Sequence, residues 1–516
     1  MTMNIARIIG ACALAAALFA ATPAAAQVGP PSPASADEEL AGADQAAPEA
    51  PAARRRPRLE VHPYIEVNAA MSAELSGGDD DVHSGVAMVH AEAAPGVSLD
   101  AGAMATRSGG AGRGGVINER QPSAQVYSVY AGPTVNRQVG PVSVGAAYRL
   151  GYVRIEQEDE LAGDPAGAGF DDAIAHNATA SVGMAPGRLP FGWTVGAGYV
   201  REESGELENR FQGTYIRGDV VVPIGPTLAF TAGVGYERID SSQQDVLRDA
   251  AGVPVLVGGR LVVDPTRPRL EGFGSDGLIY DAGVIWRPTP RTELQARAGR
   301  RYGGTTVTGS LQHRFARGYA FSASVYDSVS PFGTRIINDV SALPANFNVN
   351  RNPLTGAMDG CVFGEDPGTG TCFDDVLQTL SSATSRSRGA NLTFSGSRGH
   401  WDFGVGAGFA HNRAFNLVSG DIGSIDPENS QSVFLNAGLG RRLSRYSGMS
   451  LDATANWFDS DRFGSEPSFG SGLTGSYYRS FLIERLQFHA ALGLYYSNGL
   501  IDSTSATGLI GLRYTF

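Results

Sequence analysis

The sequence ends with the stretch TGLIGLRYTF, which runs from Thr507 to Phe516. Apolar or aromatic side chains occupy every second position there, namely Ile510, Leu512, Tyr514 and Phe516. A period of two places these side chains on one face of a β-strand and the residues between them on the other face. The chain therefore ends in a strand with one apolar face. The rest of the sequence is needed to tell whether this apolar face contacts a protein core or lipid.

The same alternation recurs from about residue 63 onward, most clearly in 142–152, 191–199, 227–236, 401–409 and 486–494. In 191–199, Phe191 and Tyr199 stand at the two ends of the apolar face, with Val195 between them. A transmembrane β-strand has this arrangement because ~10 residues cross the hydrocarbon and aromatic residues lie at each interface. The pattern thus favours lipid as the environment of the apolar face.

The connections between these segments alternate between short and long. The short ones are rich in Pro and Gly and lie at 95–96, 136–141, 186–190, 223–226, 288–290, 316–318, 398–400, 445–448 and 481–485. The long ones lie at 107–122, 157–171, 241–273, 332–383 and 415–429. Short periplasmic turns and long outer loops are typical of outer-membrane barrels. Nine short turns predict an all-β, transmembrane antiparallel up-and-down β-barrel of about 20 strands (roughly 18–22), with both termini in the periplasm and the long loops extracellular.

The N-terminal residues are expected to lie outside the barrel. Residues 1–26 have the features of a secretory signal peptide, because Arg7 precedes the apolar run IIGACALAAALFA and small residues precede Gln27. Residues 27–62 are rich in Ala, Pro and acidic residues, so we expect a disordered periplasmic linker. The barrel is then expected to span residues 63–516.

Cleavage of the signal peptide removes Cys12 and leaves two cysteines, Cys361 and Cys372. Both lie in the longest loop, 332–383, of an exported chain. Exported proteins fold in oxidising compartments, so the two thiols are expected to form one local disulfide. A loop of this length usually carries function, and we expect it to fold into the mouth of the barrel.

The terminal strand resembles the assembly signal of outer-membrane β-barrel proteins, which ends on Phe. The matching residues are Phe516, Tyr514 and Leu512, with Ile510 behind them. The resemblance implies a bacterial outer-membrane barrel whose last strand is bound by the barrel-assembly machinery in the periplasm. The whole of 63–516 fits this architecture.

Two further stretches, RLEVHPYIEVNAAMSAEL (58–75) and NFNVNRNPLTGAMDGCVFGEDPGTGTCFDD (346–375), resemble an uncharacterised, porin-like group of bacterial outer-membrane barrels. Some members are labelled as preprotein translocase subunits. That label implies a small protein with one spanning helix, and no mature segment here matches it. Related barrels are associated with exopolysaccharide export, which the resemblance adds as an alternative function.

Enzymatic activity is not expected. Residues 495–502, YYSNGLID, resemble the His-x-Ser-Asn motif of outer-membrane phospholipases, but Tyr495 stands where the catalytic His belongs. With a pKa near 10, a tyrosine is a poor base at neutral pH. We instead interpret Asn498-Gly499 as a hairpin turn in the last loop. No spacing indicates a metal or cofactor site, and the net charge of −12 argues against a nucleic-acid partner.

Charged residues are predicted on the lumen side of several strands. By strand parity, the inward-pointing side chains include Arg149, Arg297, Arg314, Arg513, Glu237, Glu293 and Asp402. Such charges either select which ions pass or only neutralise one another across the lumen, and the sequence favours neither interpretation.

The favoured function is a porin-like, passive channel for small solutes, with outer-membrane lipid as its surroundings. An export barrel is a second hypothesis, and it predicts a wide lumen with no inserted loop. A non-conducting surface barrel that binds a partner through its outer loops is a third hypothesis. The sequence does not indicate the solute or the oligomeric state.

The assembly signal can be tested by removing or replacing Phe516. Deleting it, or substituting Phe516→Ser, is expected to lower the amount of barrel in the outer membrane, measured in isolated membranes. A variant that inserts as well as the wild type would contradict this assignment.

Overall fold

The structure is a computed structural model. It describes residues 59–68, 82–109, 123–157, 172–205, 207–257, 260–315, 318–343, 347–349, 361–364, 370–372, 384–415, 429–461, 467–481, 486–498 and 503–514. The predicted signal peptide and most of the predicted linker lie outside these residues. The helix in the described part of the chain is too short to cross a bilayer.

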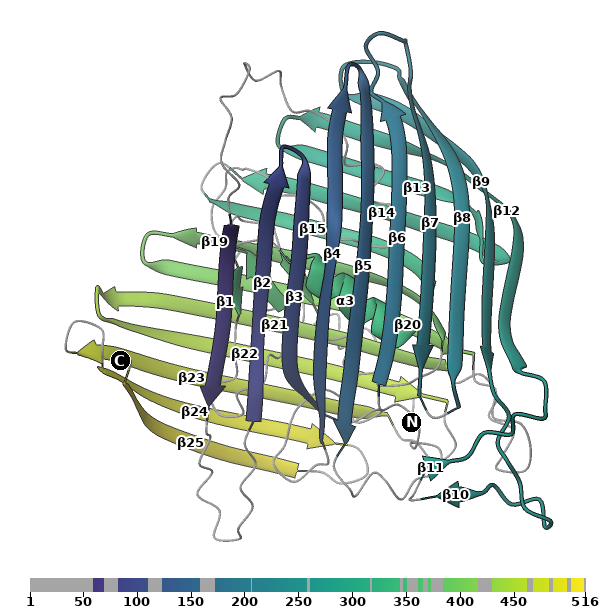
Figure 1. The fold of residues 1–516 in the computed structure, drawn as a ribbon. Helices are drawn as coiled ribbons and strands as arrows, with labels where there is room; N and C mark the ends of the chain where they lie inside the picture. Colours follow the sequence, from purple (N-terminus) through teal and green to yellow (C-terminus); the bar gives the residue numbers. More distant parts are fainter. Residues whose placement is uncertain are drawn as a thin grey trace.

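The first half of the chain forms long strands joined in sequence (Figure 1). These are β1 (Leu59–Asn68), β2 (Val82–Ala94), β3 (Val97–Gly109), β4 (Ser123–Val139), β5 (Val142–Gln157), β6 (Asp172–Met184), β7 (Gly192–Ser204), β8 (Asn209–Pro223) and β9 (Leu228–Gln243). A small hairpin follows, β10 (Leu256–Val257) with β11 (Arg260–Leu261).

The second half continues with β12 (Leu270–Thr289), β13 (Thr292–Arg301), β14 (Gly304–Phe315) and β15 (Tyr319–Ser330). After the elements between β15 and β19, it resumes with β19 (Ser385–Arg398), β20 (Trp401–Ala414), β21 (Asn429–Ser444), β22 (Ser447–Ser460), β23 (Ser468–Phe481), β24 (Leu486–Asn498) and β25 (Ser503–Tyr514).

These 20 long strands form one antiparallel up-and-down sheet that curls into a β-barrel (Figure 1). Each strand pairs with the next, with β9 joined to β12 and β15 to β19. Within the described residues, β1 pairs only with β2 and β25 only with β24. The predicted fold class and the strand number of about 20 are confirmed. The wall begins at Leu59, four residues before the expected start.

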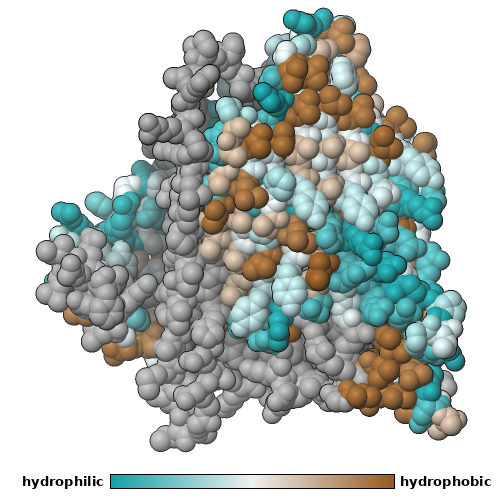
Figure 2. Space-filling view, viewed as in Figure 1, coloured by the Kyte–Doolittle hydropathy of each residue, from teal (hydrophilic) through white to brown (hydrophobic). Residues whose placement is uncertain are grey.

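The outer surface of the wall is apolar, as the alternation predicts. In β9, Phe230 and Val234 are about half exposed, whereas Thr231 and Glu237 on the other face are buried. The same division holds around the sheet, with exposed apolar side chains at Val129, Leu150, Ile216, Leu278, Val307, Leu473, Leu492 and Ile510. Figure 2 shows apolar side chains spread over the upper and middle parts of the face turned to the viewer. A wall that exposes apolar groups and buries polar ones is suited to lipid.

Aromatic side chains gather on the outer face close to the short turns. Phe394 lies 6.0 Å from Phe315 and 5.4 Å from Phe403, and Tyr319 lies 5.7 Å from Phe403, measured between ring centroids. These four residues come from β14, β15, β19 and β20, next to the turns after Phe315 and Arg398. Their position matches the aromatic girdle at one interface of a membrane barrel.

The segment between β15 and β19, residues 331–384, is called the inner segment below. Its described parts are α3 (Phe332–Ser341), β16 (Phe347–Val349), β17 (Cys361–Gly364) and β18 (Gly370–Cys372). Helix α3 contacts the inner faces of β3 to β6, and Figure 1 shows it behind these strands, within the curve of the sheet. The chain therefore crosses the barrel from β15 to the wall on another side.

One sequence-based assignment is wrong. Tyr495 to Asn498 were expected in the last loop, but they form the end of strand β24. Tyr495 and Ser497 alternate with the exposed Tyr496 and are buried on the inner face. Asn498 is therefore the last residue of the strand, which continues further than the turn signal suggested, and Gly499 lies outside the described residues.

The outward apolar face generates a prediction about membrane stability. Leu492, in the middle of β24, is 73% exposed. Leu492→Arg is expected to destabilise the inserted barrel by about 2–4 kcal/mol, because an arginine near the bilayer midplane costs that much. Urea-dependent unfolding in lipid vesicles measures this. Leu256→Arg, at an exposed leucine in the β10–β11 hairpin outside the wall, is the control. Equal losses in both variants would contradict the proposed lipid face.

Candidate functional site in the barrel interior

Helix α3 covers an apolar sector of the inner wall. Its buried residues Phe332, Ile336, Ile337 and Val340 pack against Met104, Val126, Tyr130, Val153, Ile155, Ala173 and Ala175 of β3 to β6. Gly151 on β5 makes room for the helix, because a Cβ added there would lie 2.1 Å from Ile337. This sector is apolar although it faces the lumen, because a helix and not water covers it.

A buried carboxylate holds the first turn of α3. Glu202 of β7 is 1% exposed and accepts hydrogen bonds from the backbone N–H of Gly333 (3.1 Å) and of Thr334 (2.6 Å). The Thr334 hydroxyl donates a third bond, of 2.7 Å. Pro331, which precedes the helix, makes no side-chain cap. The barrel wall therefore supplies the negative charge that a helix N-terminus favours.

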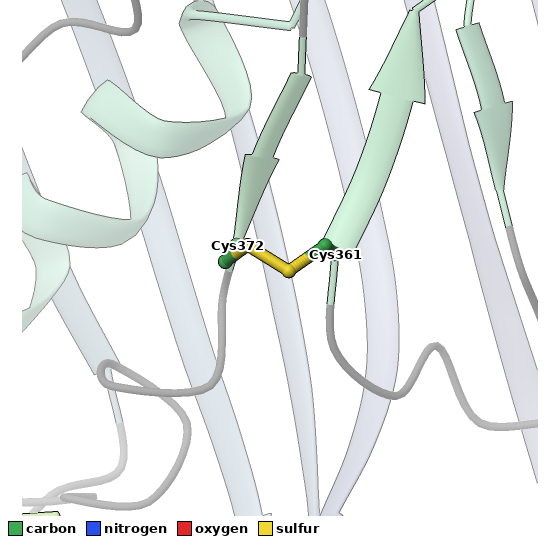
Figure 3. The surroundings of a disulfide bond; sticks show 2 residues. All are labelled: Cys361 and Cys372. Atoms are coloured by element: carbon green, nitrogen blue, oxygen red, sulfur yellow. A yellow bond between two sulfur atoms is a disulfide. The ribbon is translucent and has the colours of Figure 1, made fainter. Parts of the chain in front are cut away.

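The disulfide hairpin of the inner segment lies on a second sector of the wall. Cys361 on β17 and Cys372 on β18 are buried and joined to each other, as Figure 3 shows. Cys361 and Phe363 pack with Phe434 of β21. On β20, a Cβ at Gly406 would lie 2.2 Å from the Cys361 Sγ. Inward glycines of β20 thus leave the space that the hairpin occupies.

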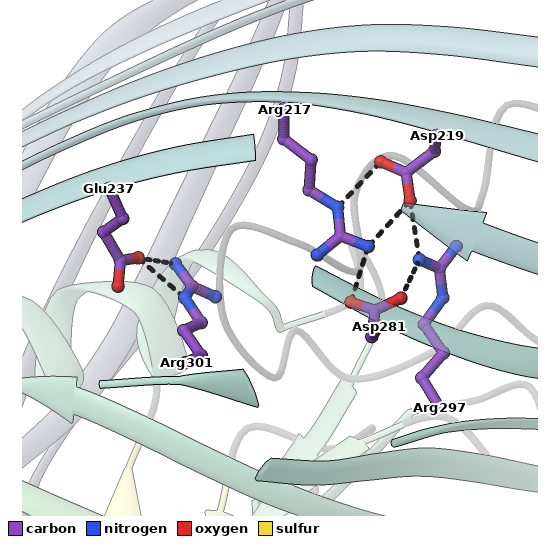
Figure 4. Close-up of polar contacts among 6 residues, drawn as sticks. All are labelled: Arg217, Asp219, Glu237, Asp281, Arg297 and Arg301. Atoms are coloured by element: carbon purple, nitrogen blue, oxygen red, sulfur yellow. Dashed lines mark hydrogen bonds and ion pairs between the residues drawn. The ribbon is translucent and has the colours of Figure 1, made fainter. Parts of the chain in front are cut away.

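A third sector carries a network of charges, drawn in Figure 4. On β8, Arg217 donates to Asp219 through Nε and Nη2, both at 2.8 Å. Arg217 also contacts Asp281 of β12 at 2.6 Å. Arg297 of β13 lies 2.7 Å from Asp219 and 3.2 Å from Asp281. Each carboxylate in this group therefore shares two guanidinium groups.

A separate ion pair, between Glu237 and Arg301, lies nearby on the same side of the barrel. Glu237 of β9 is 3% exposed and accepts a 2.6 Å hydrogen bond from Nε of Arg301. The three arginines of Figure 4 thus face three carboxylates, and the group is neutral as a whole. Buried ion pairs keep their charges only when such partners satisfy them.

The charged network also depends on a glycine. Gly233 of β9 is the register partner of both Asp219 and Asp281, so it lies between their strands. A Cβ there would lie 2.1 Å from Arg217 Nη2 and 2.4 Å from Asp219 Oδ1. The guanidinium group of Arg217 therefore occupies the space that a side chain at position 233 would fill.

A fourth sector, on β19 to β23, is polar but largely uncharged. Several buried atoms there have no hydrogen-bond partner in the described part of the chain, namely Asn391 Oδ1, Asn412 Nδ2, Ser432 Oγ, Asn456 Oδ1 and Ser468 Oγ. Buried polar atoms require partners, and water supplies them in a lumen. This sector therefore suits a hydrated passage.

Near the rim that carries the turn between β13 and β14, apolar side chains pack beside the charged sector. Phe211, Ile239, Tyr302 and Val329 form a buried cluster. Tyr302 occupies the two-residue turn between β13 and β14 with a φ of 55°. The guanidinium carbon of Arg301 lies 4.7 Å from the centre of its ring, and that of Arg386 lies 5.4 Å away. Tyr302 therefore joins the apolar cluster to Arg301 of the separate ion pair.

The predicted lumen charges have different partners in the structure. Arg297 and Glu237 belong to the network above, and Glu293 accepts a 2.9 Å hydrogen bond from Arg287. Asp402 is more than half exposed and lies 3.8 Å from Arg442. Two more, Arg149 and Arg314, lie half-buried on the inner face.

The residues of the predicted assembly signal are only partly described. The backbones of Leu512, Arg513 and Tyr514 belong to β25, and Arg513 is the register partner of Gln487. Their side chains and the whole of Phe516 lie outside the described residues. The roles assigned to them remain predictions.

Sequence reasoning missed several interior residues. Arg217, Asp219 and Asp281 follow the same parity as Arg297, so a systematic count of inward positions would have found them. Glu202 also occupies an inward position of β7, but parity does not reveal its contact with Thr334 of α3, which lies 132 residues away.

The fold and the occupied interior define a β-barrel with an inserted segment. No protein-family model matches the chain, and no curated protein matches it. Among solved structures, it is similar to the siderophore receptor PirA from Pseudomonas aeruginosa, with 13% identity and a TM-score of 0.40, covering 91% of this chain and 76% of that one.

Two other solved structures also have low sequence identity and low TM-scores to this chain. The ferric preacinetobactin receptor BauA from Acinetobacter baumannii has 10% identity and a TM-score of 0.44, covering 88% of this chain and 75% of that one. OccK5 (OpdH) from Pseudomonas aeruginosa has 11% identity and a TM-score of 0.29, covering 81% of this chain and 98% of that one. Similarities this low assign neither a family nor a function.

The contact between Glu202 and α3 can be tested directly. Glu202→Ala is expected to weaken the first turn of α3 by about 1 kcal/mol, with a range of roughly 0.5–2, the usual cost of removing a helix cap. Hydrogen exchange of a peptide covering Gly333 and Thr334 should then be faster. The control is Glu203→Ala, because Glu203 lies on the outer face and contacts Arg201 and Arg210. Equally slow exchange in all three proteins would contradict the anchoring role.

Proposed function

We propose that the protein is an outer-membrane transport barrel, through which small solutes pass along a lumen that the inner segment constricts. The observation that carries the proposal is the arrangement of the interior. Helix α3 and the disulfide hairpin each lie against a separate sector of the wall. The third and fourth sectors of the inner face are charged or polar, as a water-filled passage requires.

The proposed location is the outer membrane of a Gram-negative cell envelope, with the apolar outer face in lipid. In this orientation the nine short turns and both termini face the periplasm, and the inner segment enters from the outside. The last strand would be the part that the barrel-assembly machinery binds. The oligomeric state is not part of the proposal.

The inserted segment bears on the two alternative functions. An export barrel for polysaccharide predicts a wide lumen without an inserted loop, and α3 packed on β3 to β6 disfavours it. A partner-binding barrel predicts a closed lumen, and the apolar cluster around Tyr302 near the rim is the observation that favours it. Conductance separates that alternative from a channel.

The proposal predicts the conductance of the purified protein. In planar lipid bilayers the wild type is expected to give small, discrete conductance steps. Gly151→Leu is expected to give larger steps, because the new side chain occupies the site of Ile337 and displaces α3 from the wall. The β-content, measured by circular dichroism, should not change, since the wall strands remain paired.

The matched control is the same substitution at Gly440, an inward glycine of β21. The nearest atom to a Cβ there is the Asp402 carbonyl oxygen at 3.7 Å, so the added side chain meets open space. Gly440→Leu is expected to leave the steps unchanged or smaller. If neither the wild type nor Gly151→Leu conducts at any voltage, the channel proposal fails and partner binding becomes the better account.

A further inference from the structure

One carboxylate of the inner wall differs from those of the charged network. Asp219, Glu237 and Asp281 each contact at least one arginine. Asp452 also lies within a strand and on the inner face, on β22. Its carboxylate accepts a 2.9 Å hydrogen bond from the Ser450 hydroxyl. Within the described residues, Ser450 is the side chain that contacts this carboxylate, and no ion pair is found for it.

On one side of Asp452, the two neighbouring strands have glycine at the positions in register with it. Asp452 is the register partner of Gly438 on β21, and Gly438 is the partner of Gly404 on β20. The ring of Phe363, from the disulfide hairpin, lies over Gly404, because a Cβ there would approach it to 2.6 Å. Neighbouring strands lie ~4.8 Å apart, so the backbones of Gly404, under the ring, and of Asp452 are about 10 Å apart. Gly438 lies between them, and these two glycines are called the glycine floor.

The other side of Asp452 is lined with hydroxyl groups. Its partner on β23 is Thr474, whose hydroxyl lies 3.1 Å from that of Tyr495. The hydroxyls of Ser450 and Ser476 lie 2.8 Å apart. These groups are neutral and are bonded to one another, so they leave the negative charge of Asp452 uncompensated.

We propose that Asp452 and Phe363 form a binding site for a cationic group, and that the solutes of this barrel are small organic amines. This inference rests on the proposed transport function and adds the class of solute. The carboxylate supplies the charge, and the face of Phe363 attracts the same cation through its π-electrons. The glycine floor between them gives an ammonium group with a short alkyl chain access to both.

A metal ion is a poorer candidate for this position. Divalent cations bind through several carboxylate or carbonyl oxygens, and no group of three or more potential ligand residues occurs in the described part of the chain. Anions are excluded here by the sign of the charge. A neutral solute bound by the hydroxyls is a separate outcome of the experiment.

The experiment measures block of potassium current by butylammonium, with butan-1-ol as the uncharged probe of the same size. Butylammonium is expected to block the wild type, and butan-1-ol is not. Asp452→Asn should raise the half-blocking concentration about tenfold, equivalent to about 1.4 kcal/mol. Phe363→Leu should raise it about threefold, as expected for loss of an exposed cation–π contact.

Asp276→Asn is the matched control, because it removes one negative charge from the outer face, where Asp276 is 50% exposed. It should leave the block unchanged. Equal block of wild type and Asp452→Asn would overturn the proposal, and so would equal block by butan-1-ol.

A wild type that carries no current would contradict the proposed transport function alone. Calorimetric titration of the detergent-solubilised protein with butylammonium then decides the site separately. Binding to the wild type that Asp452→Asn abolishes supports the site. Absence of binding to the wild type, or undiminished binding to the variant, overturns it.

Discussion

The structure depends on one constraint, namely that strands must satisfy each other's backbone hydrogen bonds while apolar side chains face outward. In lipid, an unpaired N–H or C=O group costs several kcal/mol, so only continuous pairing is stable. Twenty strands, each paired antiparallel with the next, meet this requirement along the described sheet. Because the side-chain period of a strand is two, an apolar outer face leaves every intervening residue on the inner face. The residues that line the interior are therefore every second residue of each strand.

Glycines at inward positions leave space for other groups inside the barrel. Gly151 leaves space for Ile337 of α3, Gly406 for the disulfide, and Gly233 for the guanidinium group of Arg217. In each case the strand keeps its backbone pairing. The absent side chain leaves room above the backbone on the inner side of the wall. The high glycine content, 68 of 516 residues, is consistent with this role. An inserted segment and a charged network thus fit within one regular sheet.

The fold was predictable from the sequence because its signals are local. Alternation and turn composition gave the number of strands, and parity gave the inward direction of Arg297 and Glu237. The contacts of these side chains were not predictable, because Arg297 meets Asp219 from 78 residues away. The contact of Glu202 with α3 could not be predicted for the same reason. The sequence of the segment that contains α3 also lacks the alternation of the wall strands. The error at Tyr495 arose because a turn dipeptide was given more weight than the strand before it.

The pairing of the lumen arginines changes how the charge of the interior is to be understood. The sequence places four arginines and three carboxylates on the inner face, and it leaves open whether these charges select ions or neutralise one another. In the structure, Arg297 shares Asp219 and Asp281 with Arg217, so its charge is cancelled where it stands. A charge without a close partner acts further into the lumen than one that is paired, because the field of a pair falls off faster with distance. If solutes pass as proposed, Asp452, held by a serine hydroxyl beside a glycine floor, is therefore expected to attract cationic solutes more strongly than the larger charged network does.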